Sequence, residues 1–169
     1  MPSTWTTIAE NNWELLHLGY IVRDLDKILE YYQSLGLISA THEFPKERHR
    51  IRFKIHKTPE TPPSPERTGP GKSQIIRMGP LPLELIQVGE GGSDPNSEYF
   101  DNHGEGVAHI GFIVEDIKAE TTKLVEKGVD ILFTMIVDDR ETMHYFDTRK
   151  HGGIVLELIQ RGTWGDQIP

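Results

Sequence analysis

Hydrophobic and polar residues follow the same pattern in two distant segments of the chain. Residues 16–22 read Leu-His-Leu-Gly-Tyr-Ile-Val, and residues 108–114 read Ala-His-Ile-Gly-Phe-Ile-Val. Both runs are rich in the β-branched and aromatic residues that favour strands. Seven residues after each His comes an Asp suited to a helix N-cap, and nineteen residues after it a Gly suited to a helix end. The pattern predicts a strand and then a helix, twice.

Each half also closes on the same five residues, Leu-Glu-Leu-Ile-Gln, at 83–87 and 156–160. The intervals that follow the two Asp residues carry apolar side chains at helical spacing, clearly in the first half and more weakly in the second. Alternating or β-rich runs predict the remaining strands over 50–56, 74–78, 131–137 and 142–147. We therefore expect two βαβββ modules, at about 14–88 and 107–161, within one domain spanning 1–169.

The first half is longer than the second because of a proline-rich stretch at about 57–73. Its prolines and glycines exclude a regular helix or strand, and we interpret it as an insertion in a hairpin. A surface loop and a lid over the site both remain open. Residues 88–106, rich in Gly, Ser, Asp and Asn, are expected to form a surface linker between the modules.

Composition narrows the classes of partner. The net charge is −8 and there is no cluster of Lys and Arg, which argues against nucleic acid and anionic membrane surfaces. No apolar run approaches the roughly 18 residues of a membrane span, and the N-terminal residues do not resemble a leader peptide, so we expect a cytoplasmic protein. A small molecule is the expected partner. With no cysteine in the chain, any metal must bind to nitrogen and oxygen.

Four residues at repeated positions are candidate metal ligands: His17, Glu84, His109 and Glu157. Each carboxylate lies within an apolar strand, where an unpaired charge is costly. Each His begins or lies in an equally apolar run without an obvious local partner. Any one of them alone is more simply a structural residue, but four donors at matching positions of two repeats predict a shared divalent cation.

The same segments resemble the vicinal oxygen chelate superfamily, which includes glyoxalase I, extradiol dioxygenases, fosfomycin-resistance proteins and methylmalonyl-CoA epimerase. Residues 102–110, Asn-His-Gly-Glu-Gly-Val-Ala-His-Ile, resemble the epimerase motif His-Gly-Glu-Gly-x-x-His-Ile. The closing Gly-Gly-x-x-x-Glu-Leu strand of the epimerases is matched by residues 152–158. The resemblance covers nearly all of residues 14–161 and is greatest to the epimerase branch.

The resemblance implies an α+β fold in which the two modules form an open, barrel-like mixed sheet around one metal ion. It further implies a homodimer, a divalent metal (Co, Mn, Ni, Zn, Fe or Mg) and an epimerase or racemase that moves a proton next to a carbonyl through a stabilised enolate. The substrate is then a small carbonyl compound, either an acyl-CoA or a compound of another class.

An epimerase needs two proton carriers, one on each face of the reacting carbon. The resemblance makes Glu157 one of them and places the second in residues 41–49, where Glu47 or Glu43 are candidates. Either could equally be a solvated charge in a hairpin. If neither acts, His42, His49 or a metal-bound water is the alternative carrier.

Other reactions fit the same ligands. A glyoxalase-like lyase or a dehydrohalogenase would differ only in its leaving group. An extradiol dioxygenase uses two His and one carboxylate, so the fourth donor, Glu84, counts against it. A ligand-sequestering protein of this superfamily typically lacks the metal ligands, so the presence of all four counts against that class as well.

Overall fold

The computed structural model describes residues 11–42, 51–56, 71–89 and 94–163. The first half contributes a strand, a helix and three further strands: β1 (Glu14–Val22), α1 (Leu25–Ser34), β2 (Ala40–His42), β4 (Lys72–Met78) and β5 (Leu81–Gln87). The second half repeats this order with β6 (Gly106–Val114), α3 (Ile117–Glu126), β7 (Ile131–Val137), β8 (Arg140–Phe146) and β9 (Val155–Gln160). A one-turn helix, α4 (Arg149–Gly152), precedes β9.

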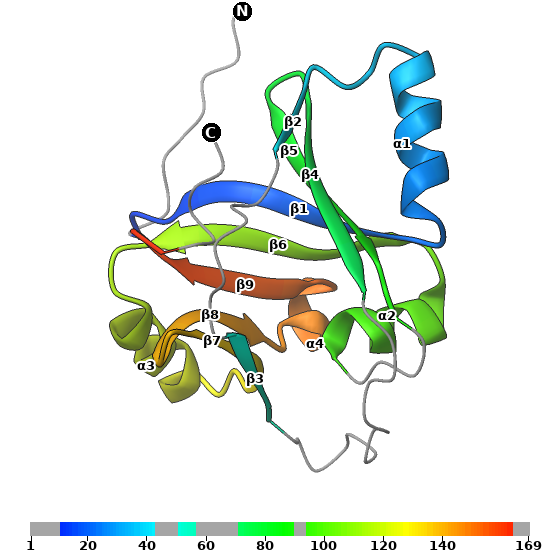
Figure 1. The fold of residues 1–169 in the computed structure, drawn as a ribbon. Helices are drawn as coiled ribbons and strands as arrows, with labels where there is room; N and C mark the ends of the chain where they lie inside the picture. The colour runs from blue at the N-terminus through cyan, green and yellow to red at the C-terminus, as the bar shows by residue number, and fades with distance from the viewer. Residues whose placement is uncertain (1–10, 43–50, 57–70, 90–93, 164–169) are drawn as a thin grey trace, which may run out of the picture.

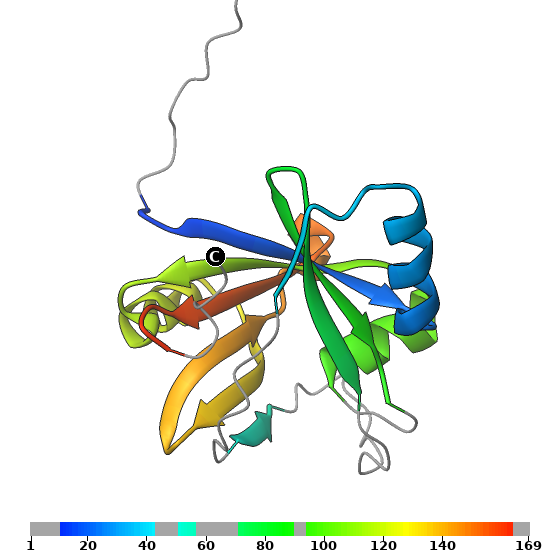
Figure 2. The same ribbon diagram turned by 45° about the horizontal axis from the view of Figure 1, so that its top comes forward.

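With β3 (Ile51–Ile55), the nine strands of the described residues form one mixed sheet with the order β2-β4-β5-β1-β6-β9-β8-β7-β3. The two opening strands, β1 and β6, lie side by side and antiparallel at its centre. Each opening strand pairs in parallel with the closing strand of its own half, β1 with β5 and β6 with β9. The sheet bends so that β4 and β5 stand on one side and β7 and β8 on the other, as Figures 1 and 2 show. This open, curved sheet confirms the predicted fold class.

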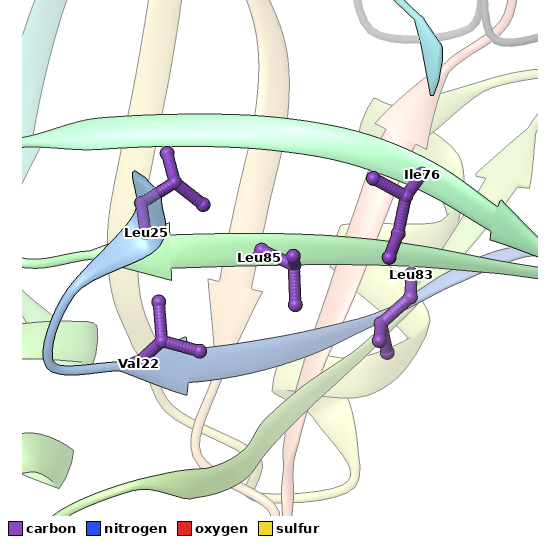
Figure 3. Close-up of a cluster of buried hydrophobic side chains, with 5 residues drawn as sticks. All are labelled: Val22, Leu25, Ile76, Leu83 and Leu85. Carbon is purple, nitrogen blue, oxygen red and sulfur yellow. The ribbon is translucent and has the colours of Figure 1, made fainter. Parts of the chain in front are cut away.

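The helices pack on the outside of the bend. α1 packs against β4 and β5, and α3 against β8 and β9 (Figure 1). Under α1, a cluster of buried side chains joins the helix start to three strands: Val22, Leu25, Ile76, Leu83 and Leu85 (Figure 3). Burial of such aliphatic side chains is the main stabilising contribution to this half. α1 and α3 therefore leave the concave face of the sheet to the candidate site.

The two helices begin as the sequence predicts. The carboxylate of Asp24 accepts a hydrogen bond from the Lys27 amide, and that of Asp116 accepts from the amides of Lys118 and Ala119. These contacts satisfy donors that a helix start leaves free. Because the caps occupy equivalent places, both helices leave their opening strands in the same way.

The region between α1 and β4 differs from the prediction. A strand over 50–56 was expected to pair within the first module, and β3 (Ile51–Ile55) instead pairs with β7 of the second half. The short strand β2 takes its place beside β4. Because β3 and β4 lie near opposite ends of the sheet order, residues 57–70 do not close a hairpin between them. The structure of residues 57–70 lies outside the described part of the chain.

The expected linker at 88–106 also contains a helix, α2 (Pro95–His103). Asp94 caps it by accepting from the amides of Asn96 and Ser97, and proline stands at its first position, where its missing N–H costs nothing. The polar composition that suggested a linker belongs partly to this capping motif. Among the helices of the described residues, none is long and apolar enough to span a membrane.

Candidate metal centre

The four predicted ligands lie on the four central strands of the sheet. His17 is on β1, Glu84 on β5, His109 on β6 and Glu157 on β9. The register places Glu84 beside Gly19 and Glu157 beside Gly111, each two residues after a candidate His. The repeat therefore brings together residues up to 140 positions apart in sequence, counted from His17 to Glu157.

A register shift on each opening strand turns the two imidazoles inward. Between β1 and β6 the pairing passes from Leu15 to His17 and omits Leu16, and the matching shift on β6 omits Ala108. Leu16 and His17 are consequently both buried although they are neighbours, which simple alternation forbids. Leu15, in contrast, is exposed.

Two glycines provide the space that the imidazoles occupy. Gly111 lies opposite His17, and Gly19 lies opposite His109. A Cβ atom on Gly19 would come within 1.9 Å of Cε1 of His109, and one on Gly111 within 2.6 Å of Oε2 of Glu157. No side chain fits at either position while the neighbouring group keeps its place.

The ligating atoms of all four side chains converge. Nε2 of His17 lies 2.9 Å from Oε2 of Glu157 and 3.4 Å from Oε2 of Glu84. Nε2 of His109 lies 3.4 Å from Oε2 of Glu157 and 3.5 Å from Oε2 of Glu84, and the two Nε2 atoms are 3.1 Å apart. Metal bonds of about 2.1 Å give ligand separations of roughly 3.0 Å for octahedral and 3.4 Å for tetrahedral neighbours. The spacing therefore suits a single cation held by His17, His109 and Glu157, and an oxygen of Glu84 lies within 3.5 Å of both imidazoles.

Burial supports the same interpretation. Glu157 and His109 are completely inaccessible to solvent, and the side chain of Glu84 is 16% exposed. Within the described residues, neither oxygen of Glu157 has a hydrogen-bond partner of good geometry. A buried carboxylate in this state is costly unless a cation compensates it. His17, His109 and Glu157 form a buried group that could bind a metal ion, and nitrogen and oxygen donors suit a divalent transition metal.

Two carboxylates determine the electrostatics of the cluster. Burial acts to lower the pKa of His17, but the negative charges of Glu157 and Glu84, whose oxygens lie 2.9 and 3.4 Å from its Nε2, outweigh it and raise this pKa to about 10. Burial acts to raise the pKa of Glu84, but hydrogen bonds from His109 and His17 hold it well below its usual range. The site thus retains positive charge, supplied by a proton when no metal is bound.

A pocket of about 460 Å³ opens beside the cluster, within the size range of small-molecule sites. Glu84 and Tyr145 form its inner end, and β3, β7 and β8 provide an apolar wall. The described lining residues include Glu84 but not Glu157, which lies behind it. A substrate in the pocket would therefore meet the cluster from the side of Glu84.

Tyr145 was missed by the sequence reasoning. It lies directly across from Glu157 on β8, and its hydroxyl lies 3.5 Å from Nδ1 of His109. Burial, followed by the charges of Glu157 and Glu84, raises the pKa of Tyr145 well above its usual value, so the phenol stays protonated. It is placed to orient His109, as outer partners of metal ligands commonly do. Tyr145 pairs with Glu157 of the repeated segment, and this pairing is the signal that could have identified it as part of the site.

The structure does not show where the candidate second proton carriers Glu43 and Glu47 lie relative to the cluster. Glu43, Glu47 and His49 lie outside the described residues. His42, the remaining alternative, is on β2 and borders a small separate pocket with Thr41. The described lining of the main pocket does not include His42.

Comparison with solved structures finds the same fold at low sequence identity. A methylmalonyl-CoA epimerase from Mycobacterium tuberculosis is 18% identical, with a TM-score of 0.56, covering 91% of this chain and 92% of that one. The Streptomyces coelicolor epimerase in complex with 2-nitronate-propionyl-CoA is 20% identical, with a TM-score of 0.57, covering 89% and 98%. A hypothetical protein from Bacillus halodurans C-125 is 18% identical, with a TM-score of 0.57, covering 90% and 97%.

A search of curated proteins finds no match to the sequence. The family model of the glyoxalase/bleomycin resistance protein/dioxygenase superfamily, in contrast, matches residues 16–146. This range contains most of β1, all of β6, the helices α1, α2 and α3, and three of the four clustered side chains. The chain therefore belongs to the glyoxalase/bleomycin resistance protein/dioxygenase superfamily.

Proposed function

We propose that this protein is a metal-dependent epimerase or racemase that removes and returns a proton at a carbon next to a carbonyl group. The observation that carries the proposal is the buried group of His17, His109 and Glu157 with Glu84, which borders the pocket, beside it; His nitrogens and Glu oxygens lie 2.9 to 3.5 Å apart. Solved epimerases with the same fold support it. His17, Glu84, His109 and Glu157 would hold one divalent ion.

Each side chain has a separate task in this proposal. A bound divalent cation would supply the positive charge that stabilises an enolate oxygen. The His residues remain neutral ligands, and Tyr145 holds the ring of His109 by its hydroxyl. The resemblance assigns proton exchange to Glu157, although Glu84 is the carboxylate that borders the pocket. Comparing Glu84→Gln with Glu157→Gln for proton exchange at equal metal content tests this assignment.

The second proton carrier is proposed to be Glu47, or Glu43 if Glu47 does not act. Replacing the true carrier by Gln is expected to leave metal content unchanged and slow inversion by roughly 10²- to 10⁴-fold, the usual contribution of a positioned acid or base. One-sided hydrogen exchange should persist. If neither variant changes the ratio of exchange to inversion, the two-carboxylate scheme is wrong.

The proposed function is tested with purified protein loaded in turn with Co²⁺, Mn²⁺, Ni²⁺ and Zn²⁺. Methylmalonyl-CoA and (R)-2-hydroxy-1-phenylpropan-1-one are incubated with it in D₂O, and loss of the α-proton signal is followed by NMR together with optical rotation. Exchange with inversion supports an epimerase. Exchange with elimination indicates the lyase or dehydrohalogenase alternative, and metal-bound protein that exchanges neither compound counts against the proposal.

Two further expectations complete the proposal. We propose that the protein acts in the cytoplasm and that it forms a homodimer, as the resemblance implies. Analytical ultracentrifugation tests the second expectation, because a single species of about 19 kDa would contradict a dimer.

A further inference from the structure

One wall of the pocket carries a continuous row of aromatic rings that ends at the candidate metal cluster. The ring centroids of Phe53 and Phe133 are 5.2 Å apart and their planes differ by only 28°. Phe133 and Tyr145 follow at 5.6 Å, and Tyr145 and His109 at 5.0 Å. We call these four residues the aromatic row. It leads from the outer edge of the pocket at β3 to the buried imidazole on β6.

The outer part of the aromatic row is open to solvent. Phe53 is 58% exposed, yet it borders the pocket together with Phe133 and Tyr145. Apolar side chains fill the adjacent surface: Ile55, Ile86, Met135 and Met143. Flexible methionines adapt to ligands of different shapes and contact aromatic rings favourably. An exposed apolar surface inside a pocket indicates an apolar ligand.

Among the residues that the structure describes, the charges that line the pocket do not suit a polyanion. Glu84 and Asp94 both line it, and Lys72 is the basic residue among the described lining side chains. The ammonium group of Lys72 lies 2.9 Å from a carboxylate oxygen of Asp26, so its charge is already paired. The phosphates of a coenzyme A group need several cations for tight binding.

In the described part of the chain, the aromatic side chains that line the pocket lie on β3, β7 and β8. Tyr145 lies across from Glu157, whereas the residue across from Glu84 in the first half is Ile75. The metal donors therefore repeat between the halves, but the surface beside them does not. A flat ligand would bind with its ring on the β7 and β8 side and its polar end at the cluster.

We propose that the substrate is a carbonyl compound with an aromatic or similarly flat apolar group next to its metal-binding oxygens, and not an acyl-CoA. This inference rests on the proposed function, because it assumes that the oxygens bind a metal held by the cluster. It assigns the apolar group to the aromatic row.

The inference is tested by calorimetric titration of Co²⁺-loaded protein with benzohydroxamate and acetohydroxamate. Both present the same pair of oxygens to a metal and differ in a phenyl or a methyl group. Benzohydroxamate should bind about 10- to 100-fold more tightly, as expected for burial of a ring. Phe53→Ala and Phe133→Ala should reduce this ratio to within about threefold without weakening acetohydroxamate.

Phe112→Ala is the matched control, because Phe112 packs against Trp13 in a cluster away from the pocket. It should leave the ratio unchanged. Adenosine 3′,5′-bisphosphate, an anionic fragment of coenzyme A, should not displace benzohydroxamate at millimolar concentration. Equal affinities for the two hydroxamates, or displacement by the bisphosphate, would overturn the inference and leave the metal site intact. Failure of both hydroxamates to bind metal-loaded protein would count against the proposed function itself.

Discussion

The closest contacts in the candidate metal centre depend on two residues that have no side chain. Gly19 and Gly111 stand opposite His109 and His17 in the central strand pair, and the pairing of Leu18 with Ile110 lies midway between them. Each half of the repeat thus provides an imidazole and the space for the imidazole of the other half. The His-x-Gly pattern is therefore a packing requirement of the duplicated site.

Gly111→Ala should impair metal binding more than it impairs folding. The new methyl group would lie 2.6 Å from Oε2 of Glu157 and 2.9 Å from Cε1 of His17, so these side chains must move. Overpacking of this kind costs about 1–3 kcal/mol. Metal content by mass spectrometry should fall, with a lower urea midpoint. Gly152→Ala is the control, because its nearest neighbour would lie at an ordinary 3.7 Å. Equal metal content in both variants would contradict the packing argument.

The alanine variants of the two His residues test the ligand assignment directly. Removing His17 or His109 takes away one nitrogen donor and leaves two buried carboxylates with less counter-charge. Both variants should lose bound metal and unfold at a lower denaturant concentration. Full metal occupancy in either variant would exclude that residue as a ligand.

His144 should make the protein sensitive to mild acid. Burial, then the positive charges of His56 and Lys54, lowers its pKa, while Glu141 acts in the opposite direction. An unfolded chain protonates this His near pH 6.5, before the folded protein does. Its contribution to stability is therefore complete above pH 6.5 and is lost as the pH falls toward the lowered folded-state pKa.

Urea unfolding at pH 7.5 and pH 5.5 tests this prediction in wild type and His144→Gln. The variant should lose less stability between the two pH values than the wild type does. The difference between the proteins isolates His144 from His17, whose raised pKa has the opposite sign. A larger acid-induced loss in the variant would contradict the assignment.

At the level of the elements, the sequence predicted the opening strands, both long helices and the closing strands because each carries its own local signal. Asp24 and Asp116 cap the helices, and apolar periodicity sets their faces. The register shifts at Leu16 and Ala108 were not predicted, because they arise from the pairing of two strands and not from either one. The pairing of β3 with β7 was not predicted either, because it joins segments that lie far apart in the sequence.

The repeated closing segment has a second function beside presenting Glu84 and Glu157. Oε1 of Gln87 accepts a hydrogen bond from the amide of Leu25 at 2.9 Å, and Oε1 of Gln160 accepts from the amide of Ile117 at the same distance. The final residue of each half thus joins its last strand to the start of its helix. The Gln in the repeated five residues is explained by this contact.

Gln87→Ala and Gln160→Ala should each destabilise the fold without removing metal. A partly buried helix amide loses its acceptor in either variant, which costs about 1–3 kcal/mol when the donor stays unsatisfied. Urea unfolding measures the loss, and metal analysis provides the internal control. A stability within error of the wild type in both variants would show that water replaces the side chain.

At the scale of the whole molecule, the duplication indicated which side chains would lie close together, whereas nothing in the sequence indicated that a strand of the first half pairs with the second half. Four donors at repeated positions indicated one shared cluster before any contact was known. The segment between α1 and β4 gave no repeated pattern of this kind. The corresponding segment of the second half, between α3 and β8, is shorter and has no equivalent of β3. The aromatic row depends on this exchange of β3 between the halves, since Phe53 reaches the pocket only through the pairing of β3 with β7.

Replacing residues 57–70 tests the exchange of β3. The replaced segment connects a strand beside β7 to a strand beside β5, and Ile55 and Lys72 both border the pocket between them. A two-residue Asn-Gly turn spans at most about 7 Å of chain, so it should pull β3 away from β7. A Gly-Ser linker of the original length should preserve the pairing. Hydrogen exchange at the β7 amides and urea unfolding compare the two variants with the wild type. Native stability and protection in the short-turn variant would show that β3 and β4 form the hairpin that the sequence alone had suggested.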